Sequence, residues 1–261
     1  MTAPAIATES RGVARVVTID RPDQGNALNG AVASGIVAAL DAAEADPACR
    51  VVVLTGRGDK VFCAGGDLKS TGGDAPFDVD PSDPRNFVVA LLRRIAECRL
   101  PIVARINGHA VAGGLGLVCA CDLAVASERA RFGVPEVGIG TFPMMILPFL
   151  MRVMPVRTLL ELCLTGDLID AADARACGLV NRVVPPAELD AATDALVARL
   201  ASRSPTAVRL GKQGAHAMRD MALGEALEYA QLMIALMVQT RDAAEGIAAF
   251  RARRPPEWTG R

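Results

Sequence analysis

Short apolar runs separated by amphipathic stretches fill the first two thirds of the chain. The stretch Arg50–Thr55 is nearly continuous in apolar residues, which is typical of a strand buried on both faces. Similar runs predict strands at Val13–Ile19, Pro101–Ile106, Leu123–Ala126 and Leu179–Val184. Helical spacing predicts helices over 30–45, capped by Asn29, over 85–98, and over 143–164 with interruptions near Pro148 and Pro155. Turns are predicted at Arg21–Gly25 and Arg131–Pro135. This alternation of elements predicts an α/β core.

The predicted strands stop near Pro186, and the pattern beyond it is helical. Amphipathic helices are predicted over 189–200, 223–237 and 242–253. A helical tail that cannot enclose its own core must pack on its own domain or on a neighbouring subunit, and we expect both. We therefore divide the chain into a core, residues 1–186, and a C-terminal helical region, residues 187–261.

The stretch Asn107–Asp122 predicts the end of a strand, a tight turn, and a helix that begins near Gly113. The helix is apolar on all sides, so it is expected to be buried. Its first turn has unpaired N–H groups and a partial positive charge, and Gly113 and Gly114 leave those donors open. A second apolar strand, Val61–Leu68, also runs into small residues. Either glycine segment alone fits close packing, but two backbone donors that meet at one point form an oxyanion hole.

Composition narrows the function classes. The chain has 28 basic and 29 acidic residues, a net charge of −1, and no basic stripe, so we expect neither nucleic-acid nor membrane-surface binding. Its apolar runs are too short to cross a bilayer, and residues 1–12 do not predict a secretory signal. Seven scattered cysteines predict reduced thiols and a cytoplasmic location. No metal site is expected, because Cys119 and Cys121 lack partners and His109 and His216 are far apart.

Several short motifs follow one another in a fixed order along nearly the whole chain. They are Arg21-Pro22, Asn26-Ala27-Leu28, Phe62–Leu68, Asn107-Gly108, Ala112-Gly113-Gly114, Cys121-Asp122, Phe132–Glu136, Leu164-Thr165-Gly166, Gly178-Leu179-Val180, and Glu245-Gly246-Ile247 with Phe250. Together these motifs resemble the enoyl-CoA hydratase/isomerase (crotonase) superfamily. The resemblance implies a spiral of ββα units with a C-terminal helical region, and a trimer or a hexamer made of two trimers. It also implies a coenzyme A thioester as substrate and no further cofactor.

The resemblance also implies a set of site residues. The backbone N–H groups of Ala64 and Gly113 would bind the thioester oxygen. The turns around Ala27-Leu28 and Ala64–Leu68 would hold the pantetheine and adenine, which brings in Cys63, Gly65, Gly66, Asp67, Leu68 and Gly114. Lys60, Lys69 and, from a neighbouring subunit, Arg253 stand where the family often contacts the phosphates. Each of these three cations is also compatible with an ordinary surface charge.

The chemistry centres on Glu136, at the position where the superfamily keeps a catalytic carboxylate. A thioester releases protons next to its carbonyl because the charge moves onto oxygen, and a partly buried carboxylic acid can exchange such protons near neutral pH. The chain departs from the family at Gly116, where hydratases usually carry a second glutamate. One carboxylate suffices to move a double bond, so the mechanism favours isomerase-type proton transfer over efficient hydration, without separating them.

Other polar residues near the motifs are expected to have structural roles. Asp67 is expected to hold its loop through backbone N–H groups, Asp122 to be structural, and His109 to be packed. No fixed cation lies beside Cys63 in the sequence to activate its thiol. The bulky segment Pro143–Leu147 predicts a restricted acyl pocket, and residues 70–84 predict a mobile surface loop beside the entrance.

Two alternative functions stay open. The same oxyanion hole could support hydrolysis or decarboxylation of a coenzyme A thioester with a different base or none. Alternatively, because one expected carboxylate is missing, the protein could bind acyl-CoA with little turnover.

Overall fold

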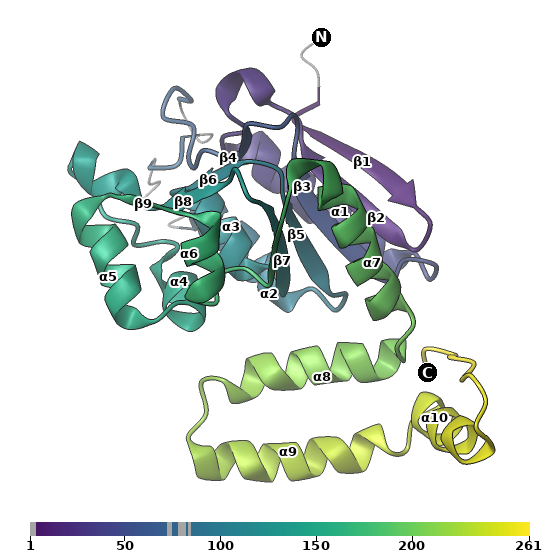
Figure 1. Ribbon diagram of the computed structural model, residues 1–261. Helices are drawn as coiled ribbons and strands as arrows, with labels where there is room; N and C mark the ends of the chain where they lie inside the picture. Colours follow the sequence, from purple (N-terminus) through teal and green to yellow (C-terminus); the bar gives the residue numbers. More distant parts are fainter. Residues whose placement is uncertain (1–3, 72–74, 78–81, 83–84) are drawn as a thin grey trace.

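The computed structural model describes residues 4–71, 75–77, 82 and 85–261, which form two β-sheets surrounded by helices (Figure 1). The larger sheet has the order β1-β2-β3-β5-β7-β10, in which β1 is antiparallel to β2 and the other neighbours are parallel. Its strands are β1 (Ile6–Arg11), β2 (Ala14–Ile19), β3 (Val51–Gly56), β5 (Ile102–Ile106), β7 (Leu123–Ser127) and β10 (Arg182–Val184). The smaller sheet is formed by β4 (Val61–Cys63), β6 (His109–Val111), β8 (Arg131–Gly133) and β9 (Leu168–Asp170).

The chain climbs through these sheets as a spiral. Each of the pairs β3-β4, β5-β6 and β7-β8 places its first strand in the larger sheet and its second in the smaller one. The first two pairs are followed by α2 (Phe87–Glu97) and α3 (Gly113–Ala120). The predicted crotonase-like spiral of ββα units is therefore confirmed. The other helices are α1 (Gly30–Ala45), α4 (Leu147–Val153), α5 (Val156–Thr165), α6 (Ala171–Ala176), α7 (Leu189–Ala201), α8 (Pro205–Met218), α9 (Leu223–Met237) and α10 (Arg241–Ala252).

Strand β3 shows why the continuous apolar run is needed. Val52 and Leu54 pack into the main core with α1, α2 and α3, whereas Val51 and Val53 pack on the opposite face with Leu196 of α7. Side chains alternate between the two faces of a strand, so a strand covered on both faces must be apolar at every position. The fully buried helix predicted from Gly113 is also present, with Gly114 to Ala120 buried.

Several local predictions were wrong because pairing between distant segments decided them. The predicted turn at 131–135 begins instead with β8, since Phe132 pairs with Ala110 of β6 and Ile169 of β9. The interruption predicted near Pro155 is confirmed, since Pro155 lies between α4 and α5. Pro148 does not interrupt a helix, because it lies in the first turn of α4, where proline is tolerated. Strands β1, β6 and β9 and helices α6 and α8 were not predicted. The loop predicted over 70–84 lies largely outside the described residues.

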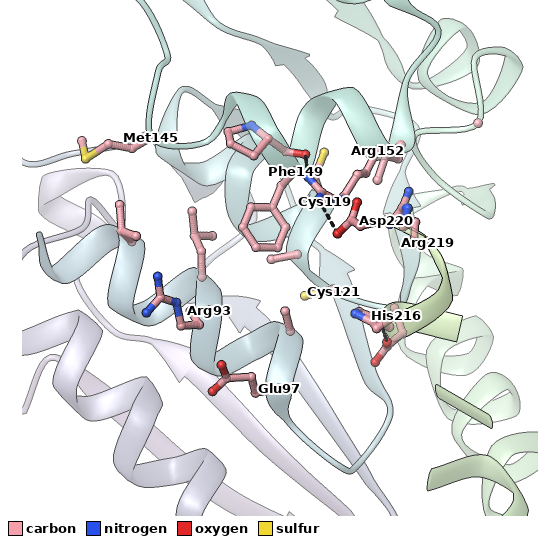
Figure 2. A pocket seen from close by; sticks show the side chains of 18 residues that line it. Arg93, Glu97, Cys119, Cys121, Met145, Phe149, Arg152, His216, Arg219 and Asp220 are labelled. Carbon is pink, nitrogen blue, oxygen red and sulfur yellow. Dashed lines mark hydrogen bonds and ion pairs between the residues drawn. The ribbon is translucent and has the colours of Figure 1, made fainter. Parts of the chain in front are cut away.

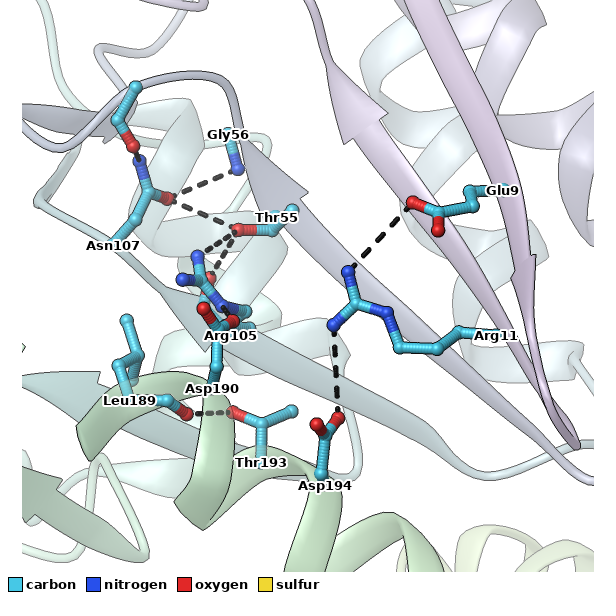
Figure 3. Close-up of polar contacts among 11 residues, drawn as sticks. Glu9, Arg11, Thr55, Gly56, Arg105, Asn107, Leu189, Asp190, Thr193 and Asp194 are labelled. Atoms are coloured by element: carbon cyan, nitrogen blue, oxygen red, sulfur yellow. Dashed lines mark hydrogen bonds and ion pairs between the residues drawn. The ribbon is translucent and has the colours of Figure 1, made fainter. Parts of the chain in front are cut away.

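Helix α7 packs on the larger sheet even though it follows the predicted boundary at residue 186. Arg105 of β5 donates to Asp190 at 2.8 Å, and Arg11 of β1 lies 3.8 Å from Asp194 (Figure 3). These contacts add to the apolar packing of Leu196. The boundary therefore marks a change in the type of element, whereas the part that projects from the core is α8 to α10 (Figure 1).

A partly buried ion pair attaches this projecting part to the core. Lys212 of α8 donates to Asp122 at 2.6 Å and to the Leu100 carbonyl at 2.9 Å. Asp122 also accepts from the Ile102 N–H at 2.7 Å, which agrees with the structural role predicted for it. Among the described residues, no helix is long and apolar enough to cross a membrane.

The end of the chain folds back on Asp242 of α10. This carboxylate accepts hydrogen bonds from the Ser204 hydroxyl at 2.8 Å, the Thr259 N–H at 2.7 Å and the Gly260 N–H at 3.0 Å. Burial alone would raise its pKa, but these hydrogen bonds outweigh burial and lower the pKa of Asp242 to about 2. The Asp242 carboxylate thus holds the segment around Thr259 and Gly260 against α10.

We expect Asp242→Asn to destabilise the protein by about 2 kcal/mol near neutral pH, because the lowered pKa of Asp242 means that the fold stabilises its charged form. A lowered folded-state pKa stabilises the fold above the unfolded pKa, and that contribution disappears as the pH falls through the folded value. The difference in thermal midpoint between wild type and variant should therefore shrink between pH 5 and pH 2. Asp194→Asn, at an exposed ion pair, is the control with a small effect. A difference that grows on acidification would contradict the prediction.

Candidate active site

Two backbone segments from different turns of the spiral meet at the centre of the site. One follows β4 at residues 63–66, and the other leads from β6 into α3 at residues 112–114. A Cβ added at Gly114 would lie 2.1 Å from the Cys63 carbonyl oxygen, and one at Gly65 would lie 2.6 Å from the Ala112 Cβ. Only glycine therefore allows the two segments to approach so closely.

A third segment, residues 25–28, completes this backbone frame. The Leu28 N–H donates to the Gly65 carbonyl and the Asp67 N–H donates to the Leu28 carbonyl, both at 2.7 Å. Arg21 binds Asp67 at 2.7 Å, and this hydrogen bond is the main cause that lowers the pKa of the Asp67 carboxyl. Asp67 also accepts from the Lys69 N–H at 3.0 Å, so it holds its own loop as predicted.

The structure corrects one of the two predicted oxyanion donors. The Ala64 N–H donates to the Gly25 carbonyl at 3.0 Å, so it is not free to bind a substrate oxygen. Two residues further on, the Gly66 N–H makes no hydrogen bond to any described residue. The Gly113 N–H opens α3 and likewise has no partner in the described chain. The available pair of donors is therefore Gly66 and Gly113; the sequence spacing alone did not distinguish Gly66 from Ala64.

The residue before α3 has an unusual backbone conformation. Ala112 has a φ of 52° and a ψ of −129°, which is unfavourable for a residue with a side chain. Its N–H donates to the Gly133 carbonyl at 2.9 Å, and its Cβ packs against Gly65. The smaller sheet and the neighbouring loop thus hold the entry to α3 in one geometry.

Gly66, Gly113 and Glu136 line one cavity, which we call the central pocket. Its volume is about 550 Å³. Apart from Glu136 and Thr141, the described side chains on its walls are apolar or absent. The lining residues are Leu28, Ala64, Gly66, Leu68, Pro76, Phe77, Val88, Ala112, Gly113, Pro135, Glu136, Ile139, Thr141, Phe142, Pro143, Met144, Met145 and Ile146.

Glu136 is the ionisable side chain of this lining. It lies in the short 3₁₀ helix Pro135–Ile139, which ends at Gly140 in the left-handed conformation. Its Oε2 atom is buried and has no hydrogen-bond partner in the described structure. Burial raises the pKa of this carboxyl, because charge is poorly solvated there. Such a carboxylate is suited to exchanging protons with a bound substrate.

The space beside Gly116 is filled by an apolar side chain. A Cβ at this position would lie 2.4 Å from Ile146 Cγ2 and 2.8 Å from Ile146 Cβ. Ile146 is buried, and its branched carbons are attached close to its backbone, so they cannot swing away freely. The site therefore lacks the second carboxylate and also the room for one.

Several other predicted site residues lie outside the lining of the central pocket. Cys63 is fully buried and burial raises the pKa of its thiol to about 12, so it is neither exposed to the pocket nor reactive. His109 is exposed rather than packed, and its Nδ1 accepts from the Arg131 N–H at 3.1 Å. The predicted residues that line no part of the pocket are Ala27, Lys60, Cys63, Gly65, Asp67, Lys69, Gly114, Gly116 and Arg253.

Similarity to known proteins identifies the family. A sequence model of the enoyl-CoA hydratase/isomerase family matches residues 8–261. The chain belongs to this family. As a member of the family, it is an enzyme of the hydratase/isomerase type that acts on coenzyme A thioesters.

Similar proteins match this family member over almost its whole length. It is 39% identical over 249 residues to a putative enoyl-CoA hydratase of Thermus thermophilus, covering 95% of this chain and 98% of the relative. It is 34% identical to an (E)-benzylidenesuccinyl-CoA hydratase of Thauera aromatica, covering 94% of each. A crystal structure of an enoyl-CoA hydratase from Mycobacterium smegmatis superposes with a TM-score of 0.89 at 31% identity, covering 98% of this chain and 99% of that one.

Proposed function

We propose that this family member moves protons on the acyl group of an enoyl-CoA, with double-bond isomerisation favoured over hydration. Glu136 is the acid/base, and the N–H groups of Gly66 and Gly113 form the oxyanion hole. The observation that carries this proposal is that all three residues line one apolar pocket of about 550 Å³. Backbone donors and a carboxyl of raised pKa in such a pocket fit a reaction that passes through an enolate.

The proposed reaction requires only one carboxylate. With a 3-enoyl thioester, ionised Glu136 takes a proton from C2, and the electron pair moves to the thioester oxygen as the enolate forms. The two N–H donors stabilise that oxygen. The carboxylic acid then returns the proton to C4, and the double bond comes to lie between C2 and C3. No atom is gained or lost, and Glu136 ends in its starting state.

Hydration is the second candidate, and the names of the relatives favour it. In this chain, Glu136 alone would have to orient the water and supply the proton. The apolar contact between Gly116 and Ile146 offers no hydrogen bond to such a water, which supports isomerisation as the faster reaction.

Two substrates separate the candidates in one spectrophotometric assay. Isomerisation of a 3-enoyl-CoA creates the absorbance of a conjugated thioester, and hydration of a 2-enoyl-CoA removes it. We expect the first reaction to be faster. Release of free thiol would show hydrolysis instead, and binding of both substrates without turnover of either would contradict the proposal.

A second carboxylate should raise hydration only when space is made for it. Gly116→Glu alone places its Cβ against Ile146, and such overpacking typically costs about 1–3 kcal/mol. We expect the double variant Gly116→Glu/Ile146→Gly to raise the ratio of hydration to isomerisation at least about tenfold, which is less than the about hundred- to ten-thousand-fold that an ideally positioned acid/base group contributes. Ile146→Gly alone is the control. An unchanged ratio in a folded double variant would count against our explanation of Gly116.

We also propose that the protein assembles as a trimer, or as a hexamer of two trimers, through α8 to α10. Helix α9 has no buried residue in the single chain. Large apolar side chains on α9 and α10 are exposed, including Leu223, Leu227, Leu232, Ile234, Leu236, Ile247 and Phe250. Contact with neighbouring chains would remove this surface from water. It would also bring Arg253, at the end of α10, to another subunit, as the family resemblance implies for the coenzyme A phosphates.

Reduced thiols support the proposed cytoplasmic location. All seven cysteines are free, and burial raises the pKa of Cys119 and Cys163 among others. Buried thiols of this kind are typical of a reducing compartment. We propose no cofactor besides the coenzyme A of the substrate.

A further inference from the structure

A second cavity lies beside the central pocket, on the other side of Met145. Its volume is about 790 Å³, and it lies between α2, the C-terminal end of α3 and α4, next to the end of α8 (Figure 2). Of the described residues, Met145 is the one that lines both cavities. Figure 2 shows Met145 at the edge of the second cavity, with its side chain pointing away from Phe149 and Cys119.

The walls of the second cavity carry both apolar and charged side chains. Val89 and Leu92 of α2 and Phe149 of α4 provide apolar surface. Arg152 and Asp220, which are partly or largely exposed, bind each other at 2.7 Å. The ionisable residues of the lining are Arg93, Glu97, Asp122, Arg152, His216, Arg219 and Asp220. The apolar part of this lining offers a surface on which a hydrocarbon chain can pack.

The position of the second cavity along α2 supports a connection between it and the central pocket. Val88 lines the central pocket, and the next residue, Val89, lines the second cavity. Met145 is partly buried and packs against the main core. Its side chain is unbranched and flexible, and methionine fills irregular space without fixing one shape. A single flexible side chain thus lies between the central pocket and the apolar part of the second cavity.

We propose that Met145 sets the length of the acyl chain that the enzyme accepts. In the wild type it closes the end of the central pocket, so short enoyl groups are preferred. When the Met145 side chain is removed, the far end of a longer, unsubstituted hydrocarbon chain passes into the second cavity. This inference rests on the proposed function, because it assigns the acyl group to the central pocket.

The test compares kcat/KM for 3-enoyl-CoA substrates with 4, 8, 12 and 16 acyl carbons. Each methylene that the protein buries contributes about four-fold. We expect the wild type to gain nothing beyond a short chain, and Met145→Ala to raise the ratio of the 12-carbon to the 4-carbon substrate at least about tenfold, as for two further buried methylenes. Met151→Ala, at an exposed methionine of α4 outside both linings, should leave this ratio unchanged.

A substitution that fills the second cavity should reverse the effect of Met145→Ala. Val89→Trp occupies the second cavity from α2, so Met145→Ala/Val89→Trp should return the ratio toward the wild-type value. If Met145→Ala does not fold, Met145→Phe tests the same idea in the opposite direction, because it should lower the ratio of the 8-carbon to the 4-carbon substrate. Equal rates at all lengths in the wild type, or the same ratio in a folded Met145→Ala protein, would overturn the proposal.

Binding measurements separate this inference from the proposed reaction. Dissociation constants of saturated acyl-CoA of the same lengths, measured by calorimetry, need no turnover. If no enoyl-CoA reacts but the dissociation constants still follow the Met145 pattern, the chain-length role holds and the reaction fails. If turnover occurs without any Met145 dependence of rates or binding, the reaction holds and this inference fails.

Discussion

Replacement of Glu136 by glutamine is expected to lower kcat for isomerisation by about a hundred- to ten-thousand-fold, the range for loss of a general acid/base. Glutamine keeps the size of the side chain but cannot accept and return a proton. Substrate binding should change little, because the apolar walls and the backbone donors remain. The measurement is the appearance of conjugated-thioester absorbance from 3-enoyl-CoA. Retention of more than a tenth of the activity would exclude Glu136 as the base.

The pH dependence provides a second readout for this variant. The base must be ionised, and burial raises the pKa of Glu136 above the ordinary glutamate value of 4.5. The wild-type kcat/KM should therefore rise with pH through a pKa above that value, and this limb should be absent in Glu136→Gln.

The same variant should not be unstable. A raised folded-state pKa means that Glu136 contributes its full stability below the unfolded pKa and loses it as the pH rises through the folded value. At neutral pH the buried, unpartnered Oε2 destabilises the fold. We expect Glu136→Gln to have an equal or higher thermal midpoint at neutral pH, with a smaller advantage below pH 4.

Removal of one oxyanion donor is expected to have the next largest effect. Gly113 is the first residue of α3, where the missing N–H and fixed φ of proline suit a helix. Gly113→Pro therefore deletes the proposed donor at the helix position where proline is generally best accommodated. We expect kcat to fall by about a hundred- to a thousand-fold, as for loss of one donor in a measured oxyanion hole.

Gly113→Ala is the matched control for this variant. It keeps the N–H group and adds a Cβ that would lie 3.2 Å from Leu28 Cδ1, a contact that a small shift of the leucine relieves. Its kcat should remain within about tenfold of the wild-type value. This decrease is much smaller than the one expected from a missing donor. Circular dichroism and thermal midpoints establish that both variants fold. Equal activity of the two variants would mean that the Gly113 N–H does not bind the developing oxyanion.

The local pattern of apolar and polar residues predicted the helices and strands whose surroundings are reflected in their own residues. Asn29 caps α1 through a hydrogen bond from the Val32 N–H at 3.0 Å, as its position indicated. Arg50–Thr55 corresponds to β3, because a strand buried on both faces is apolar at every position. The exposed strand β9 and the short strand β8 carry no such pattern. Their pairing with each other and with β6 is the only reason they are extended.

The features of the candidate site divide in the same way, into those that the sequence predicts and those that tertiary contacts decide. The sequence by itself determined the family and gave Glu136 and Gly113 as candidate site residues, because residue types in a fixed order are a property of the chain. Only the tertiary structure decided that the Ala64 N–H donates to the Gly25 carbonyl while the Gly66 N–H has no partner among the described residues, that Ile146 fills the space beside Gly116, and that Met145 lines two cavities. Each of these depends on which atoms from distant segments lie within a few ångströms of each other, and close packing sets that only once the whole chain has folded.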